Sequence, residues 1–171
     1  MEGGMMENLY LRPASCEDED LLLIWANNPE VRQNSFQTKM ITVEEHKKWF
    51  RRMMEDPREI QYILMSDGVP AGQVRISCNG ETAEINYSIS ADFRGRGYGE
   101  KLIQLVRQEV VRDYPEIRTL LGKVKPGNVA SEKCFSRNEF KITYSCFEYE
   151  IHRNQNEQDA AVDYEADKMG E

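Results

Sequence analysis

The sequence predicts one mixed α/β domain, with a mostly antiparallel twisted sheet of six to seven strands flanked by about four helices. Three observations indicate this fold class: two turn signals that divide an apolar region into a three-strand meander, a glycine cluster that leads into an amphipathic helix, and strand-like and helix-like segments that alternate after it. The length of 171 residues suits a single domain.

The N-terminal half is expected to contribute one strand and two helices. Residues 8–13 read as a short strand that a proline ends. Residues 17–27 carry leucines at helical spacing, and an Asn-Asn-Pro run ends that helix. Thr42, with Glu45 three residues later, is a capping box that opens a helix reaching about residue 54.

The middle of the chain predicts a meander of three strands. Residues 60–66 are apolar, and residues 71–77 and 83–90 follow as further strands. The turns between them are signalled by Asp67-Gly68 and Asn79-Gly80, which favour tight hairpins.

The C-terminal half changes character at the glycine cluster of residues 94–99. A helix follows, with apolar residues at spacings of three and four up to residue 110. Residues 117–124 read as a strand, and 128–138 as a helix that begins at a good N-cap. Residues 140–151 are expected to close the domain as a strand or a strand pair.

The charge balance excludes a general nucleic-acid binder. The chain has 22 basic and 30 acidic residues, a net charge of −8. Residues 153–171 hold six acidic and two basic residues, which is half of that net charge, and they are expected to form an acidic, flexible tail. A short terminal helix that docks Val162 and Tyr164 on a partner is the alternative. The predicted organisation is an N-terminal extension at 1–7, a domain at 8–152 and this tail.

Localisation and metal content are predicted from what the sequence lacks. The longest apolar run, 21–26, is far below the roughly 20 residues that cross a bilayer, so no membrane association is expected. The first residues have no signal-peptide pattern, which favours the cytoplasm. Four widely spaced cysteines without a CxxC pair predict reduced thiols and no metal site.

The glycine cluster 94–99 is the strongest functional signal. A dinucleotide-binding GxGxxG motif is excluded because position 100 is Glu, and a phosphate-binding loop of the GxxxxGK type is absent. Glycines that lead into a helix still expose backbone N–H groups that favour an anion. Arg94 and Arg96 add positive charge there, although ordinary solvated arginines are the simpler interpretation.

Two motifs resemble the GCN5-related N-acetyltransferase family, known as GNAT. One is its acyl-CoA signature, Gln or Arg, two residues, Gly, one residue, Gly or Ala, and the other is a downstream Asn before an apolar helix face. The matching positions are Arg94, Gly97 and Gly99 in the first motif and Asn128, Ser131 and Phe140 in the second. The resemblance spans about residues 8–151 and implies a GNAT fold and acetyl-CoA as the cofactor.

The resemblance also implies which residues bind the cofactor. The strand before the loop splays from the next strand, and its backbone near Ile89 pairs with the pantetheine amides. Asn128 contacts the pantetheine arm or the thioester region, which makes it a catalytic candidate as well as a helix cap. The implied cofactor-binding residues are Ile89, Arg94, Gly95, Arg96, Gly97, Tyr98, Gly99, Asn128 and Ser131.

Acetyl transfer to an amine needs a base, oxyanion stabilisation and a proton for the leaving thiolate. Glu84 is the candidate general base, because many members of the family carry a Glu at this strand that acts through water; an exposed strand carboxylate is the simpler interpretation. The family's acid, a Tyr seven residues after the Asn, is replaced by Phe135, and the Gly before the closing Phe is Glu139. The thiolate leaves unassisted, or the acid is another group such as Tyr144, Tyr87 or Cys134.

The N-terminal half resembles the acetyltransferases of the pseudaminic-acid type, which acetylate the 4-amino group of a UDP-linked amino sugar. The residues that carry this likeness are Trp25, Asn27, Pro29, Val31, Arg32, the region of Ile41, His46 and Trp49. The expected acceptor is therefore a small-molecule amine, with a UDP-amino sugar preferred. The predicted acceptor-binding residues are Arg32, His46, Trp49, Arg75 and Tyr87, of which His46 and Trp49 are alternatively plain core residues.

Other acceptors and functions stay open. The ribosomal-protein N-terminal acetyltransferases share the opening LRP…ED and the AEIxY strand, and polyamine or antibiotic acceptors also fit. The Phe at the position of the acid favours a catalytically weak acetyl-CoA-binding module. Family members often dimerise, so a homodimer is a further expectation.

Overall fold

The computed structural model describes residues 7–143. Its contacts divide the chain into Met1–Lys141 and Ile142–Glu171, and every element named here lies in the first unit. The strands are β1 (Leu9–Pro13), β2 (Glu59–Ser66), β3 (Val69–Asn79), β4 (Thr82–Ile89) and β5 (Thr119–Gly122). The helices are α1 (Glu19–Ala26), α2 (Pro29–Asn34), α3 (Val43–Glu55), α4 (Tyr98–Asp113) and α5 (Val129–Arg137). Short 3₁₀ turns occupy Cys16–Asp18 and Ala91–Phe93.

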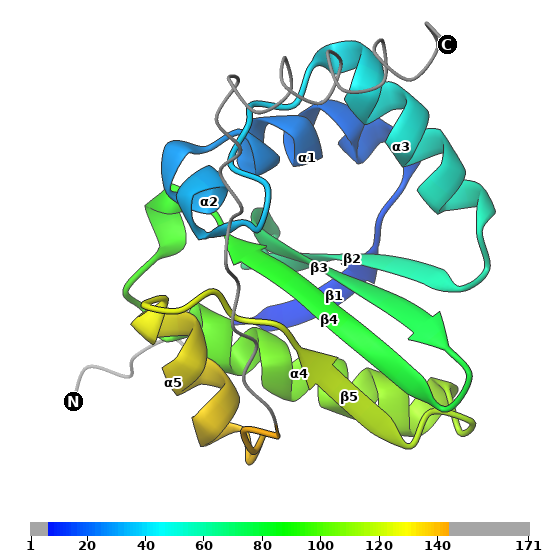
Figure 1. Cartoon of the computed structure of the whole chain (residues 1–171), viewed down its shortest axis with the longest axis vertical. Coiled ribbons are helices and arrows are strands. Elements are labelled where there is room, and N and C mark those ends of the chain that lie inside the picture. Colours follow the sequence, from blue (N-terminus) through cyan, green and yellow to red (C-terminus); the bar gives the residue numbers. More distant parts are fainter. Residues whose placement is uncertain (1–6, 144–171) are drawn as a thin grey trace, which may run out of the picture. The chain divides into compact units, whose positions relative to one another are not determined.

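The five strands form one sheet in the order β1-β2-β3-β4-β5. All neighbours are antiparallel except β4 and β5, which are parallel because α4 crosses over between them. Figure 1 shows α1, α2 and α3 on one side of the sheet and α4 and α5 on the other. The predicted mixed α/β fold class is confirmed.

The strand count differs from the prediction of six to seven. Residues 140–143 form no strand, and the rest of the predicted closing segment, 144–151, lies outside the described residues. The two predicted hairpins are both present. Asp67 and Gly68 adopt φ values of 48° and 82°, which is the left-handed turn that an Asp-Gly pair favours.

Each face of the sheet carries its own apolar cluster, and β2 contributes to both by alternation. Tyr62 and Leu64 face α4, whereas Ile63 and Met65 face α1 and α3. The cluster on the α4 side is the larger one. On the opposite face the apolar residues stop at β2, and the same face of β3 and β4 is polar, as described below for the cleft.

Helix α2 is absent from the elements that the sequence predicts, because the Asn-Asn-Pro run indicates a stop. The structure shows that the run also begins a helix. The Asn28 side chain accepts hydrogen bonds from the backbone of Glu30 and Val31, and Pro29 occupies the first helical position. Both are standard start signals. The capping box of Thr42 and Glu45 is confirmed at the start of α3.

An ion pair between the half-buried Arg12 and the buried Asp18 fixes the chain between β1 and α1. The Arg12 guanidinium donates to both carboxylate oxygens of Asp18 at 2.7 and 2.8 Å, and Asp18 also accepts from the backbone of Ser15. The Arg12 hydrogen bonds lower the pKa of Asp18, although burial opposes them. This pair therefore anchors the helices of the smaller cluster to the sheet.

Candidate active-site cleft

A cleft of about 860 Å³ opens where β4 and β5 diverge. The two strands are paired only from Thr82 and Thr119 to Ile85 and Gly122. Beyond that point, residues 86–89 of β4 pair with β3 alone in the described part of the chain. Their free edge and the chain that leads into α5 form two walls of the cleft. An extended ligand with amide groups can add to such an edge.

The glycine loop forms one end of the cleft. Gly95 and Gly97 have φ values of 76° and 78°, and nothing lies within 4 Å of a Cβ built on either. Gly97 is the N-cap of the long helix α4 and provides no side-chain cap. The N–H groups of the first turn therefore face open space, which suits an anionic group such as a diphosphate.

Gly99 and Tyr98 have packing roles instead. A Cβ on Gly99 would lie 2.9 Å from the Cys134 sulfur, so this glycine allows α4 and α5 to approach each other. The Tyr98 side chain points into the core, where its hydroxyl and that of Ser66 are hydrogen-bonded at 2.8 Å. Tyr98 and Gly99 can therefore offer a ligand only their backbone N–H groups.

The two arginines of the loop are placed differently. Arg94 lines the cleft, but its guanidinium is engaged: it donates to the Ile89 carbonyl at 3.1 Å and to the Asn28 side chain at 3.0 Å, and it forms an ion pair with Glu30. Arg96 is exposed and stacks over the Phe93 ring at 5.2 Å, outside the cleft wall. Arg96 is therefore the more available cation for a phosphate.

Three further candidates meet at the start of α5. Asn128 is the N-cap and accepts from the Ser131 backbone at 3.2 Å. The Ser131 hydroxyl is 3.1 Å from the hydroxyl of Tyr87, which reaches across from β4. Burial raises the pKa of Tyr87 well above its ordinary value, so its hydroxyl stays protonated. All three line the cleft.

Phe135, at the position of the family's acid, is a packing residue. Its ring lies directly over Gly122, where a Cβ would be 2.2 Å from the ring edge. Tyr87 and Phe140 contact it edge-on, with ring centroids 5.9 and 5.0 Å away. Glu139 adopts a φ of 67°, a left-handed conformation that suits the family's glycine better.

The floor of the cleft is a polar area on the α1–α3 side of the sheet. Gln61, Arg75 and Asn86 are directly opposite one another on β2, β3 and β4, and Gln73 and Ser88 form the next row. Gln61 donates to Gln73 at 2.7 Å, and Gln73 donates to Ser88 at 3.2 Å. Of this floor, sequence reasoning named only Arg75 and missed Gln61, Gln73, Asn86 and Ser88, although the alternating polar residues of the predicted strands indicated them.

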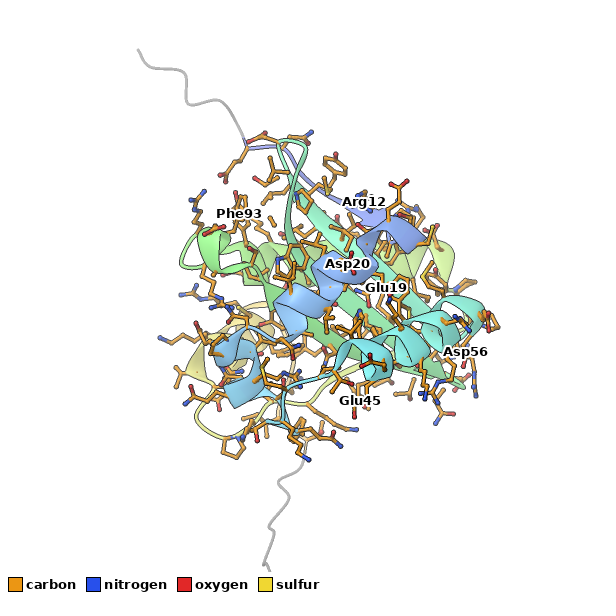
Figure 2. All side chains as sticks on the ribbon, turned by 90° about the horizontal axis from the view of Figure 1, so that it is seen from above. Arg12, Glu19, Asp20, Glu45, Asp56 and Phe93 are labelled. Atoms are coloured by element: carbon orange, nitrogen blue, oxygen red, sulfur yellow. The ribbon has the colours of Figure 1, made fainter. Side chains whose placement is uncertain are left out.

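His46 and Trp49, both predicted acceptor contacts, line the cleft from α3. Their rings lie 5.3 Å apart. His46 is only 3% exposed, and its Nε2 donates to the Glu19 carbonyl at 2.9 Å, which joins α3 to α1. Figure 2 labels Glu19 on α1 and Glu45 on α3. The Arg75 guanidinium lies over the Trp49 ring at 5.4 Å. Trp49 and Arg75 thus form one stacked surface.

Residues 29–41, which we call the α2 wall, close the cleft opposite the floor. Arg32 holds this wall together: it donates to the Ala26 carbonyl at 2.6 Å and to the carbonyls of Gln37 and Lys39 at 3.1 and 3.3 Å. Burial lowers the pKa of Arg32. Because its described partners are neutral carbonyl oxygens and the Ser35 hydroxyl, the Arg32 charge is not neutralised by a carboxylate.

Glu84 is the one predicted catalytic side chain that does not line the cleft. It belongs to the row beyond Asn86 on the same sheet face, about 7 Å along the strand. There it contributes to a smaller hollow of about 440 Å³ and pairs with Lys123 at 2.6 Å. Lys123 does line the main cleft, so Glu84 contacts the site through it.

In a chain whose net charge is −8, cationic side chains outnumber acidic ones in the described lining of the cleft. Glu30 is the single acidic side chain among the described lining residues, and it is paired with Arg94. The cationic side chains of the lining are Arg32, Arg75, Arg94, Lys123 and Lys125. Arg75 has a carboxylate neighbour in Glu59 at 3.6 Å, whereas Arg32 and Lys125 donate to backbone carbonyls.

A parallel strand pair that splays beside a glycine-capped helix is the arrangement that the resemblance of the sequence to the GNAT acetyltransferases implies. The chain belongs to the GNAT acetyltransferases, because the model of the acetyltransferase (GNAT) domain family matches residues 8–141. It is therefore an acyltransferase, and acetyl-CoA is its cofactor. A search of the curated proteins finds no match.

Solved structures share the fold at low sequence identity. A domain from Methanocaldococcus jannaschii has a TM-score of 0.71 and 22% identity, over 80% of this chain and 90% of that domain. An aminoglycoside acetyltransferase in complex with coenzyme A has a TM-score of 0.69 and 19% identity, over 80% and 86%. The Vibrio cholerae spermidine N-acetyltransferase, in complex with CoA and spermine, has a TM-score of 0.69 and 17% identity, over 75% and 78%.

The residues present fit the cofactor. The uncapped first turn of α4 matches the diphosphate, and the free edge of β4 matches the pantetheine amides. No helix of residues 7–143 is both long and apolar enough to cross a membrane. Within the same residues, no three His, Cys, Asp or Glu side chains gather as a metal site.

Proposed function

We propose that this enzyme acetylates the primary amine of an acceptor that also carries a phosphate or diphosphate, with an amino-sugar nucleotide as the preferred acceptor. The observation that carries the proposal is the charge of the cleft. An acceptor with several ammonium groups needs carboxylates to neutralise them, and the described lining offers only Glu30, which is already paired.

The positions of the cations support this acceptor class. Arg75 of the floor stacks on Trp49 of α3, and an arginine on an aromatic ring suits a phosphate beside a stacked base or sugar. The amides of Gln61, Gln73 and Asn86 are neutral hydrogen-bonding groups for sugar hydroxyls. This end of the cleft can therefore select an acceptor that is anionic at one end and an amine at the other.

Acetyl-CoA supplies an activated thioester, and the protein's residues orient the amine for direct attack in a ternary complex. Holding both substrates contributes up to roughly 7–11 kcal/mol. Tyr87 and Ser131 present a hydroxyl pair at the start of α5, where the sulfur end of the pantetheine arm is expected. Asn128 is both the helix cap and the proposed contact to that arm.

Glu84 is the proposed base, and it would act through water because it stands one row from the cleft floor. Glu84→Gln should lower kcat/KM by at least about tenfold near pH 7 with an unchanged fold. Steady-state rates between pH 6 and 9 and circular dichroism check this. A pH–rate profile identical to that of the unmodified enzyme would remove Glu84 from the mechanism.

A panel of acceptors tests the substrate class through thiol release from acetyl-CoA. We expect release with a UDP-linked 4-amino sugar, and little with spermine, kanamycin or a peptide with a free N-terminus. Release with the peptide alone would replace the proposal by a protein N-terminal acetyltransferase. CoA binding without release for any amine would support a binding module, which the apolar Phe135 favours.

A further inference from the structure

The α2 wall is tied to the cofactor side of the cleft at two points that are remote in sequence. Near its start, Arg94 of the glycine loop donates to the Asn28 side chain at 3.0 Å and pairs with Glu30. Near the end of α2, Lys125 of the loop before α5 donates to the Gln33 carbonyl at 3.1 Å. These contacts cross the cleft and join two loops that border the cofactor site to one helix that borders the acceptor site.

The wall itself behaves as one hydrogen-bonded unit. The Asn27 side chain donates to the Ile41 carbonyl and accepts from the Ile41 backbone N–H, both at 2.8 Å. Arg32 spans the interior of the wall through the three carbonyls named above. A displacement of α2 is therefore passed on to the loop after it, whose residues Phe36, Gln37 and Ile41 line the cleft.

We infer that Arg94 is a positioning residue for the acceptor rather than a ligand of the cofactor phosphates. Each of its three guanidinium nitrogens already donates to a protein acceptor: the Ile89 carbonyl, Glu30 and Asn28. The first of these holds the end of β4, and the other two hold the N-cap of α2. Arg94 thus sets the distance between the free edge of β4 and the α2 wall.

This role predicts that loss of the Arg94 contacts weakens the binding of the acceptor but not the binding of the cofactor. Without the Arg94 contacts the α2 wall becomes more mobile. The affinity for the acceptor then falls, because a mobile wall must be ordered when the acceptor binds. The cofactor keeps its site, since the three described hydrogen-bond partners of the Arg94 side chain, Ile89, Glu30 and Asn28, all lie outside α4. A charge-assisted tie between exposed and half-buried groups is strong enough to order a short helix but not to determine the fold.

The variants Arg94→Gln, Glu30→Gln and their double mutant test the inference, with Arg96→Gln as the matched cation control. Hydrogen exchange in the free enzyme should become at least about fivefold faster for amides of residues 29–41 in the first three variants, and should stay unchanged for α3. The Kd for CoA, measured by calorimetry, should stay within about twofold in these variants and rise in Arg96→Gln. The double mutant should add nothing to Arg94→Gln, which already removes the contact with Glu30.

A kinetic test becomes possible when an acceptor has been identified, and this part of the inference rests on the proposed function. The KM of that acceptor should rise at least about tenfold in Arg94→Gln and Glu30→Gln. If no acceptor of the panel reacts, the exchange and CoA measurements still decide the role of Arg94. Because the Glu30 side chain is exposed, Glu30→Gln tests the tie even where Arg94→Gln fails to fold.

Unchanged exchange in the α2 wall together with a CoA Kd that rises at least about tenfold in Arg94→Gln would overturn the inference and make Arg94 a phosphate ligand. Additive effects of the two single mutants would likewise show that Arg94 and Glu30 act separately.

Discussion

The two sides of the sheet are built in different ways. On the α4–α5 side, backbone groups and close packing define the site: a glycine N-cap, a free strand edge and a glycine beneath Phe135. On the α1–α3 side, side chains define it: a polar floor, a stacked Trp49 and Arg75, and a wall held by arginines. The first side can bind the cofactor that all family members share. The second side carries the side chains that we propose to select the acceptor.

Because of this difference, we expect substitutions on the two sides to impair the site in different ways. Backbone-built sites fail when any side chain is added, because there is no room or because the conformation is left-handed. Side-chain-built sites fail when a charge or a hydrogen bond is removed. The following substitutions separate these two kinds of failure.

The largest effect is expected for Gly122→Ala on β5. The new methyl group would overlap the Phe135 ring, whose nearest atom is 2.2 Å from the position that a Cβ would occupy. We expect the free energy of unfolding to fall by about 3 kcal/mol or more, as in severe overpacking. Urea denaturation measures it, and Phe135→Leu in the same chain should recover part of the loss. Equal stability of Gly122→Ala and the unmodified protein would contradict this packing.

Asp18→Asn tests the anchor of the α1–α3 side. Removing the carboxylate leaves the Arg12 charge half-buried, so the free energy of unfolding should fall by about 2 kcal/mol at pH 7. The folded-state pKa of Asp18 is lowered, so its contribution is present above the unfolded pKa of about 4 and is lost as the pH falls through the folded pKa. The difference between variant and unmodified protein should therefore shrink below about pH 4. A stability difference between the two proteins that stays constant from pH 7 to pH 2 would contradict a lowered pKa of Asp18.

Gly97→Ala tests the backbone cradle. Its φ of 78° makes alanine strained, and the methyl group would project into the space assigned to the diphosphate. The Kd for CoA should rise about tenfold, measured by calorimetry. Gly68→Ala, with a φ of 82° in a hairpin outside the cleft, carries the same strain and should leave the Kd unchanged. Equal Kd values for both variants would argue against the cradle.

The smallest effect is expected for Glu139→Gly. Glycine adopts the φ of 67° without strain, but the ion pair with Arg107 is lost and the unfolded chain gains freedom. The net gain in the free energy of unfolding should be below about 1 kcal/mol. Glu139→Ala keeps the strain and also loses the ion pair, so it should be less stable than Glu139→Gly; the reverse order would contradict the strain.

Much of the fold was predictable because its signals are local. The capping box at Thr42, the hairpin at Asp67 and the glycine cluster each act over a few residues, and all three appear where expected. Helix α2 was missed although Asn28 and Pro29 are start signals, because they directly follow Asn27, the C-cap of α1, and the whole run indicates a stop.

The site was predictable only where the backbone carries it. The place of Arg94 in a motif predicted a contact with the cofactor phosphates. Its contacts with Asn28 and Glu30 could not be predicted, because these partners are more than 60 residues away in the sequence. Glu84 has the residue type of a base, but the row on which it falls depends on strand register. Register and long-range ion pairs are properties of the folded chain, which composition and local spacing do not encode.

The most direct test of the difference between the two sides is the ratio of kcat/KM for two matched acceptors: a UDP-linked 4-amino sugar and the same amino sugar without the nucleotide. If the cationic acceptor side recognises the diphosphate, the ratio should be at least about 100 at low salt and should fall in about 0.3 M salt. A ratio near one, or faster reaction of the free amino sugar or of spermine, would contradict an anion-selecting acceptor site.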